Sequence, residues 1–135
     1  MFLSVLLADD SGVVRERLAA LLQEMPGVSV VGETEAVAGT LEGIRRLCPA
    51  VVVLDISMPG GSGLDVPRRM GEERLQAVVI VLTNFPFPEY EQKARAYGAS
   101  AFLNKSTEFM KVADLVRALS DQARSRLQAK ADKAL

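Results

Sequence analysis

A chain of 135 residues in which 49% of the side chains are apolar and 24% are charged can bury one hydrophobic core, so disordered and fibrous classes are excluded. Its 16 basic and 17 acidic residues leave a net charge of −1, which excludes the strong positive field of a protein that binds nucleic acid or an anionic membrane over a broad surface. We therefore expect one domain whose partners are selected by local features.

Five short apolar runs alternate with five amphipathic stretches along the chain. The runs are rich in Val, Ile and Leu and too short for typical helices, so they predict strands of a parallel sheet that is covered on both faces. The predicted strands are 2–8, 28–32, 50–54, 77–82 and 100–104. The predicted helices are 11–25, 37–47, 64–74, 88–97 and 107 to the low 120s or beyond. Gly98 is expected to end the fourth helix in the left-handed conformation, and Ser106 to cap the start of the fifth.

Strands joined by helices cross over with a right hand, which predicts a (βα)5, doubly wound α/β fold. Ligands in such folds bind at the carboxyl ends of the strands. Those ends carry three carboxylates, a hydroxyl and an ammonium, from Asp9, Asp10, Asp55, Thr83 and Lys105. Asp55 alone could be a capping residue that accepts backbone N–H groups, but its convergence with the other four favours a reactive site.

The chemistry open to this set of side chains is narrow. Three crowded carboxylates repel one another unless a cation lies between them, and Mg²⁺ is the hard dication that prefers oxygen ligands. A carboxylate can also accept a phosphoryl group, so Asp55 is predicted to be a nucleophile. Lys105 would neutralise charge on the phosphoryl oxygens, and Thr83 would donate a hydrogen bond to one of them.

Over residues 1–122 the chain resembles the receiver domain of two-component response regulators. The resemblance depends on an ordered set of residues, namely Asp9-Asp10, Asp55 followed by Met58, Pro59 and Gly63, Leu82-Thr83, and Phe102 three residues before Lys105. It implies a flavodoxin-like five-stranded parallel sheet with strand order 2-1-3-4-5. Residues 123–135 are then a polar helical extension or tail.

The resemblance also implies a role for each residue around the phosphate and the metal. Asp55 is expected to be the phosphoacceptor, while Asp10 binds Mg²⁺ directly and Asp9 acts mainly through metal-bound water. Ser57 is expected to supply a backbone carbonyl to the metal. Lys105 is expected to pair with the carboxylate of Asp55 or with its phosphate.

Two further residues match the switch of similar domains. Thr83 is expected to hydrogen-bond the phosphate and to shift with its loop. Phe102 matches an aromatic residue whose inward rotation accompanies activation, although an ordinary core position is an equal alternative. The expected output surface consists of the fourth helix, the fifth strand and the fifth helix.

Several residues depart from the family pattern. Ser106 follows Lys105 where many receivers have a cis proline, so this peptide bond is expected to be trans. Asn84 is bulkier than the usual residue after Thr83, and we expect it to slow or gate phosphoryl transfer. Pro67 falls early in the third helix, where it avoids a kink only if the helix starts late enough.

The segment from Asn84 to Tyr90, NFPFPEY, is the most individual part of the chain. Its two prolines stiffen a loop that moves on activation in similar domains. For Phe85 a core position is the favoured interpretation, whereas Phe87 is interpreted as a contact for a partner.

The resemblance implies a stand-alone phosphoacceptor response regulator that shows only phosphoryl transfer to its own Asp55 and slow autodephosphorylation. The chain has no histidine, so the donor is expected to be a histidine kinase or a histidine phosphotransfer protein. The output protein is not identified by the sequence, a phosphorylation-dependent homodimer is left open, and no direct contact with nucleic acid is expected.

A cytoplasmic location without membrane contact is expected as well. The single cysteine, Cys48, cannot form an intramolecular disulfide, and no signal segment is recognised. The longest apolar run, Ala77 to Leu82, is far shorter than the ~20 residues that cross a bilayer.

Two alternatives to the stand-alone regulator remain open at this point. The chain could be the receiver fragment of a longer transcription regulator. It could instead be an aspartyl-phosphate phosphatase of the haloacid dehalogenase type, although that family has a second acid at the position of Ser57.

Overall fold

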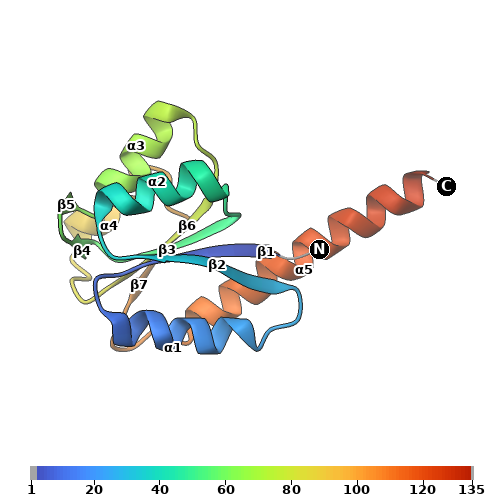
Figure 1. Ribbon diagram of the computed structural model, residues 1–135, viewed down its shortest axis with the longest axis horizontal. Helices are drawn as coiled ribbons and strands as arrows, with labels where there is room; N and C mark the ends of the chain where they lie inside the picture. Colours follow the sequence, from blue (N-terminus) through green and yellow to red (C-terminus); the bar gives the residue numbers. More distant parts are fainter. Residues whose placement is uncertain (1–2, 135) are drawn as a thin grey trace.

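The computed structural model describes residues 3–134, which form a five-stranded parallel sheet with helices on both faces (Figure 1). The elements are β1 (Leu3–Ala8), α1 (Gly12–Gln23), β2 (Val28–Thr34), α2 (Val37–Leu47), β3 (Val51–Leu54), β4 (Ser57–Met58), β5 (Gly61–Ser62), α3 (Asp65–Glu73), β6 (Val78–Thr83), α4 (Pro88–Ala96), β7 (Ala101–Asn104) and α5 (Lys111–Ala134). The sheet has the order β2-β1-β3-β6-β7, and a small hairpin of β4 and β5 follows β3. Counted over the five main strands this is the predicted order 2-1-3-4-5, so the predicted fold is confirmed.

Alternate residues of each strand contribute to two separate hydrophobic cores. Leu6 and Val52, which are neighbours across β1 and β3, pack in the core beneath α2, α3 and α4. Val5 and Val51, also neighbours, pack in the core beneath α1 and α5. Both faces of the sheet are thus covered, which is why its strands are almost continuously apolar.

Of the two helix ends predicted from the sequence, the end of α4 is confirmed and the start of α5 is not. Gly98 has φ +98° just beyond α4, as predicted for a left-handed helix end. Ser106, however, does not cap α5, because the helix begins five residues later, at Lys111. The backbone N–H of Ser106 donates to Asn104 Oδ1 at 2.9 Å, and Glu108 Oε1 accepts from the N–H of Asn104 at 3.0 Å. These side-chain hydrogen bonds hold residues 105–110 in turns and delay the helix.

Two features of the backbone depend on the presence or absence of proline. No cis peptide bond occurs within residues 3–134, so the bond between Lys105 and Ser106 is trans as expected. Helix α3 begins at Asp65, which makes Pro67 its third residue. The missing N–H therefore lies in the first turn, where no intrahelical acceptor exists, and the helix starts late enough to tolerate the proline.

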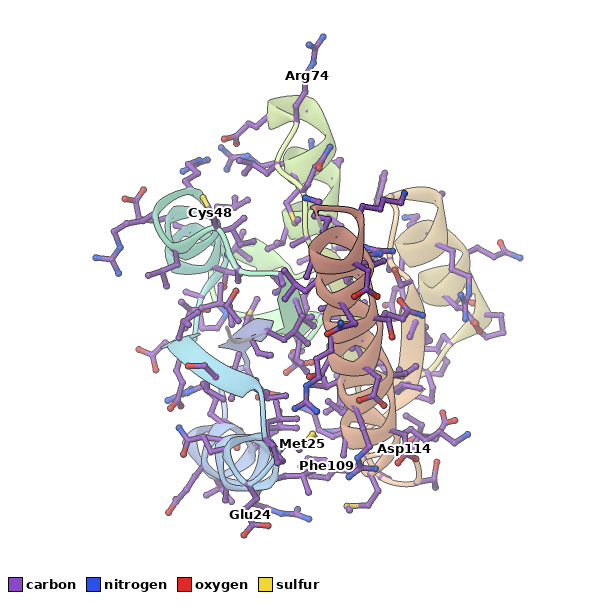
Figure 2. All side chains as sticks on the ribbon, turned by 90° about the vertical axis from the view of Figure 1, so that its right-hand side faces the viewer. Glu24, Met25, Cys48, Arg74, Phe109 and Asp114 are labelled. Carbon is purple, nitrogen blue, oxygen red and sulfur yellow. The ribbon has the colours of Figure 1, made fainter. Side chains whose placement is uncertain are left out.

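Helix α5 continues far beyond the region that packs on the sheet and runs out from the body of the domain (Figure 1). Near its start, Phe109 packs against the same core as Met25, between α1 and α5 (Figure 2). Further along, Arg124 Nη2 donates to the carbonyl of Pro26 at 2.6 Å. The helix continues to Ala134, and the side chains of residues 128–133 are exposed. No helix in the described part of the chain is long and apolar enough to cross a membrane.

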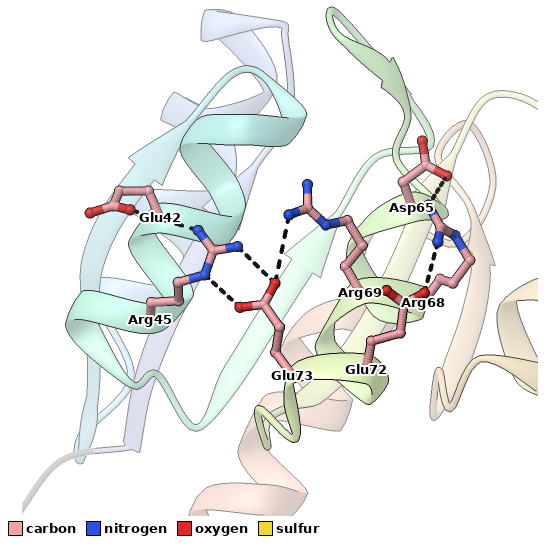
Figure 3. A network of polar contacts seen from close by, with 7 residues as sticks. All are labelled: Glu42, Arg45, Asp65, Arg68, Arg69, Glu72 and Glu73. Carbon is pink, nitrogen blue, oxygen red and sulfur yellow. Dashed lines mark hydrogen bonds and ion pairs between the residues drawn. The ribbon is translucent and has the colours of Figure 1, made fainter.

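An ion-pair network joins α2 to α3 on the molecular surface (Figure 3). Arg45 of α2 donates from Nε and Nη2 to the two carboxylate oxygens of Glu73 of α3, both at 2.7 Å. Arg69 lies 3.7 Å from the same carboxylate. The hydrogen bond from Arg45 lowers the pKa of Glu73 below its ordinary value. These arginines thus bind neighbouring acids on a solvated surface.

Candidate functional site

Three carboxylates meet at the carboxyl ends of β1 and β3, as the sequence predicted. Asp9, Asp10 and Asp55 each place a carboxylate oxygen within 4.8 Å of the others. Asp9 and Asp55 are almost fully buried, at 3% and 4% exposure, whereas Asp10 is exposed. The cluster therefore has a closed inner side and an open outer side through which an ion or a donor group can approach.

Lys105 connects the two buried acids. Its Nζ lies 2.7 Å from Asp9 Oδ2 and 3.3 Å from Asp55 Oδ2. Its backbone N–H donates to the carbonyl of Thr83 at 2.8 Å, which fixes the residue at the end of β7 against β6. The ammonium thus belongs to the same site although it is 50 residues from Asp55 in sequence.

Burial and charge act against each other at this cluster. Burial raises the pKa of Asp55 above its ordinary value, the nearby Lys105 ammonium opposes this, and Asp9 adds to the increase. For Lys105, burial by itself lowers the pKa. The hydrogen bond with Asp9 and the charges of Asp55 and Asp9 outweigh burial, so the pKa of Lys105 is raised overall.

Backbone contacts from β1 and from the hairpin of β4 and β5 hold Asp55 in place. The N–H of Asp55 donates to the carbonyl of Ala8 at 2.8 Å, and its Oδ1 accepts from the N–H of Ser57 at 3.2 Å. Gly60 takes φ +90° in the turn after Pro59, whose carbonyl accepts from the first N–H of α2. Asp55 is therefore held by a strand, a hairpin and a helix end together.

Gly63 lies directly against this strand end. Its N–H donates to the carbonyl of Ile56 at 2.6 Å, and a Cβ built at Gly63 would overlap the carbonyl oxygen of Asp55. Only glycine allows the loop to pass this close to the backbone of the candidate phosphoacceptor.

Thr83 ends β6 and is fully buried. Its Oγ1 accepts a hydrogen bond from the N–H of Phe85 at 2.9 Å. A hydroxyl that accepts one hydrogen bond can still donate another, so the proton of Thr83 is available to a phosphoryl oxygen. The contact also links this residue directly to the loop before α4.

Phe102 on β7 is 9% exposed and belongs to the core beneath α2, α3 and α4. It also lines a groove of about 480 Å³ between α4, β7 and α5. The structure therefore holds Phe102 inward, at the floor of the predicted output surface. Its rotation remains a prediction.

The aromatic loop before α4 differs from the sequence prediction at one residue. Phe85, which was predicted to lie in the core, is 45% exposed, and Phe87 is 49% exposed. Pro86 and Pro88 hold the chain extended around Phe87, which has φ −77° and ψ 141°. The ring of Phe87 lies beside those of Phe85 and Tyr90, with ring centroids 6.5 and 5.7 Å apart respectively. The extended backbone cannot turn Phe85 under α4.

Arg15 also contacts this site, although the sequence pattern did not indicate it. Its Nη1 donates to the carbonyl of Asp9 at 2.6 Å, and its Nε donates to Glu33 Oε1 at 3.2 Å. The available signal was its position one helical turn after Ser11, whose Oγ caps α1 by accepting from the N–H of Val14. An arginine there lies on the side of the helix that faces the strand ends.

The donor set fits Mg²⁺. Three carboxylates that converge on one point supply only oxygen, which is the ligand type that this ion prefers. The backbone carbonyl of Ser57 is the predicted fourth oxygen ligand. Asp10, the exposed member, leaves room for the waters that Mg²⁺ retains. The carbonyl ligand itself remains a prediction.

Comparisons with known proteins agree with this geometry. A family model described as the response regulator receiver domain matches residues 5–118. The chain is 34% identical over 119 residues to the transcriptional regulatory protein LiaR of Bacillus subtilis, covering 86% of this chain and 55% of LiaR. It is 29% identical over 117 residues to the response regulator UvrY of Escherichia coli, covering 87% of this chain and 54% of UvrY. It thus spans about half the length of these curated relatives.

A solved structure gives the same result. The signal receiver domain of the response regulator NarL from Mycobacterium tuberculosis superposes with a TM-score of 0.81 at 28% identity, covering 89% of this chain and 97% of that one. The matched family region begins within β1 and includes the other four main strands and the acidic cluster. The haloacid dehalogenase alternative is thereby set aside, and the chain belongs to the response regulator receiver domain family.

Proposed function

We propose that Asp55 accepts a phosphoryl group from the phosphohistidine of a histidine kinase or a histidine phosphotransfer protein. The observation that carries the proposal is the convergence of Asp9, Asp10 and Lys105 on the buried carboxylate of Asp55. A carboxylate surrounded by acids and one ammonium is the arrangement that an acyl phosphate intermediate requires.

In the proposed step, a carboxylate oxygen of Asp55 forms a bond to phosphorus while the P–N bond of the donor breaks. The electron pair of that bond stays with the leaving imidazole. Lys105, whose Nζ is 3.3 Å from Asp55 Oδ2, would neutralise charge on the transferred group, and Thr83 would donate its free hydroxyl proton. Mg²⁺ held by Asp9, Asp10, Asp55 and the carbonyl of Ser57 would supply positive charge to the phosphoryl oxygens.

The proposed output is a change in the surface formed by α4, β7 and α5 rather than catalysis of a reaction on a separate substrate. Loss of the contact between Thr83 Oγ1 and the N–H of Phe85 would free the loop before α4 when Thr83 turns to the phosphate. Phe102, at the floor of the groove between α4, β7 and α5, would follow this movement. The surface would then bind an output protein or a second copy of the chain. The proposed setting is the cytoplasm.

Incubation with acetyl phosphate and Mg²⁺ tests the central claim by intact-protein mass. The parent and a control, Asp132→Asn on the α5 extension, are expected to gain one phosphoryl group, and Asp55→Asn is expected to gain none. Removal of Mg²⁺ with a chelator is expected to abolish the gain in the parent. A stable gain that persists in Asp55→Asn would overturn the assignment.

A second candidate, the receiver part of a longer transcription regulator, is favoured by the lengths of the relatives. LiaR and UvrY are matched over only 55% and 54% of their lengths, and LiaR is described as a transcriptional regulatory protein. The mass of the native protein in its own cells separates the two. A product close to 14.6 kDa supports the stand-alone regulator, and one about twice as large supports the longer protein.

A further inference from the structure

Arg15 of α1 contacts the acidic cluster through a backbone carbonyl rather than through a carboxylate. Its guanidinium instead donates from Nη1 to the backbone carbonyl of Asp9 at 2.6 Å. The side chain is only 18% exposed, and Nε donates to Glu33 on β2 at 3.2 Å. Arg15 is therefore held at both ends, between the first acid of the pair and the neighbouring strand.

The backbone around Asp9 depends on this contact. The N–H of Asp9 donates to the carbonyl of Thr34 at 3.0 Å, and Asp9 Oδ1 accepts from the N–H of Ser11 at 2.9 Å. Asp9 Oδ2 accepts from Lys105 Nζ at 2.7 Å. The carbonyl is then the remaining polar group of a residue that is 3% exposed, and Arg15 satisfies it. Without Arg15 this buried acceptor would lose its partner, which is costly.

The same carbonyl belongs to the peptide plane that leads to Asp10. Because the peptide bond is planar, fixing the carbonyl oxygen of Asp9 also fixes the N–H and the Cα of Asp10. Asp10 is exposed, so surrounding side chains constrain its direction less than they constrain Asp9 or Asp55. Arg15 thus acts on the one acid of the cluster whose position packing leaves least determined.

Glu33 supplies the second half of the arrangement. The register of β1 and β2 shifts after Val5, so that Glu33 lies opposite Leu7 and Thr34 opposite Ala8 at the edge of the site. This places the Glu33 carboxylate where it accepts from Nε of Arg15. A guanidinium fixed by an acid on one side keeps its donor to Asp9 in a defined direction.

We propose that Arg15 is a positioning residue for the divalent cation site, which orients Asp10 through the carbonyl of Asp9 and is itself oriented by Glu33. The proposal rests on the proposed function of Asp9, Asp10 and Asp55 as the Mg²⁺ site. Charge alone predicts the opposite effect, because a nearby cation weakens the binding of another cation. Removal of Arg15 therefore distinguishes positioning, which loosens Mg²⁺ binding, from simple charge, which tightens it.

The test obtains the half-saturating Mg²⁺ concentration by fitting the rise of melting temperature with Mg²⁺ concentration to the linkage relation for one bound ion. It also measures the rate of phosphorylation by acetyl phosphate. Arg15→Gln is compared with Arg17→Gln, which removes the same charge from the same helix at a residue that stacks on Phe109. We expect the half-saturating Mg²⁺ concentration to rise about tenfold in Arg15→Gln and to change less than about twofold in Arg17→Gln. At saturating Mg²⁺ the rate for Arg15→Gln is expected to return to within about threefold of the parent.

Two further variants link the effect to the two hydrogen bonds. Glu33→Gln is expected to raise half-saturation by a smaller factor in the parent and to add nothing in the Arg15→Gln background, because Glu33 acts through Arg15. Arg15→Lys keeps the charge but loses the two-sided donor geometry of the guanidinium. Its half-saturating Mg²⁺ concentration is expected to lie between those of the parent and Arg15→Gln. If Arg15→Gln fails to fold, Arg15→Lys carries the test by the same comparison with Arg17→Gln.

The outcomes separate this inference from the proposed function. A parent protein whose stability ignores Mg²⁺ would overturn the metal site itself. A parent that responds to Mg²⁺ while Arg15→Gln and Arg17→Gln behave alike, or bind Mg²⁺ more tightly, would overturn only the positioning role. Equal loss of rate at every Mg²⁺ concentration would likewise show that Arg15 does not act through the cation site.

Discussion

Replacement of Gly63 by alanine is expected to damage both stability and phosphorylation. The three atoms nearest to a new Cβ are all backbone atoms: the carbonyl oxygen of Asp55, Ile56 Cα at 2.7 Å and the carbonyl oxygen of Ile56 at 2.9 Å. None of them can rotate away as a flexible side chain would, so the loop or the end of β3 must shift. The shift also endangers the hydrogen bond from the N–H of Gly63 to Ile56.

The cost combines overpacking with a weakened buried hydrogen bond and comes to about 3 kcal/mol. For a domain of this size that corresponds to a fall of roughly 10 °C in melting temperature. A displacement of Asp55 by about 1 Å would also slow phosphorylation by acetyl phosphate about a hundredfold.

The matched control is Gly71→Ala on α3, where no atom outside the adjacent residues and the backbone of the helix itself lies within 4 Å of the new Cβ. Alanine in an exposed helix is expected to stabilise the fold by about 0.5–1 kcal/mol and to leave phosphorylation unchanged. Thermal unfolding followed by circular dichroism and a mass-based phosphorylation time course measure both effects. If Gly63→Ala melted within about 2 °C of the parent, the close approach of the loop to Asp55 would be wrong.

Four other substitutions test separate parts of the structure. Asn84→Ala is expected to accelerate loss of the phosphoryl group, and kinetics equal to the parent would refute gating by the amide. Phe87→Ala, at a side chain that is 49% exposed, is expected to weaken binding of an output partner with little change in melting temperature, and unchanged binding would refute the partner contact. Asp55→Asn is expected to melt higher than the parent at neutral pH without Mg²⁺, because one of the crowded carboxylates is removed; a lower melting point would contradict this. Arg45 lowers the pKa of Glu73, so the bond between them stabilises the fold at pH values above the ordinary glutamate pKa. This stabilisation is lost as the pH falls through the pKa that Glu73 has in the folded protein. Glu73→Gln is therefore expected to lower the melting temperature at pH 7 but not in acid.

The strands and the acidic cluster could be predicted because their signals are local. The run Val51–Leu54 is apolar on both faces because both faces are buried, and Asp55 interrupts it at the strand end. Parallel topology then brings the other strand ends to the same edge whatever their distance in sequence, so Lys105 could be assigned to Asp55 without structural knowledge.

The errors came from contacts that the sequence pattern does not encode. Ser106 is of a residue type that often caps helices. However, the side chains of Asn104 and Glu108 accept hydrogen bonds from the N–H groups of Ser106 and Asn104, and α5 starts later. Phe85 is of a residue type common in cores. However, its N–H donates to Thr83 Oγ1, and the proline that follows keeps its side chain on the surface. Arg15 was missed because its partner is a backbone carbonyl, which no residue letter identifies.

The long α5 gives the bond from Arg124 to Pro26 a mechanical meaning. A helix of 24 residues is about 36 Å long, so a tilt of about 5° at its first turn displaces its far end by about 3 Å. The first turn follows the Lys105 loop, and the far end projects from the opposite side of the domain (Figure 1). Helix α5 thus begins next to the proposed phosphorylation site, and the hydrogen bond from Arg124 to Pro26 ties its middle part to the body of the domain and would oppose such a tilt.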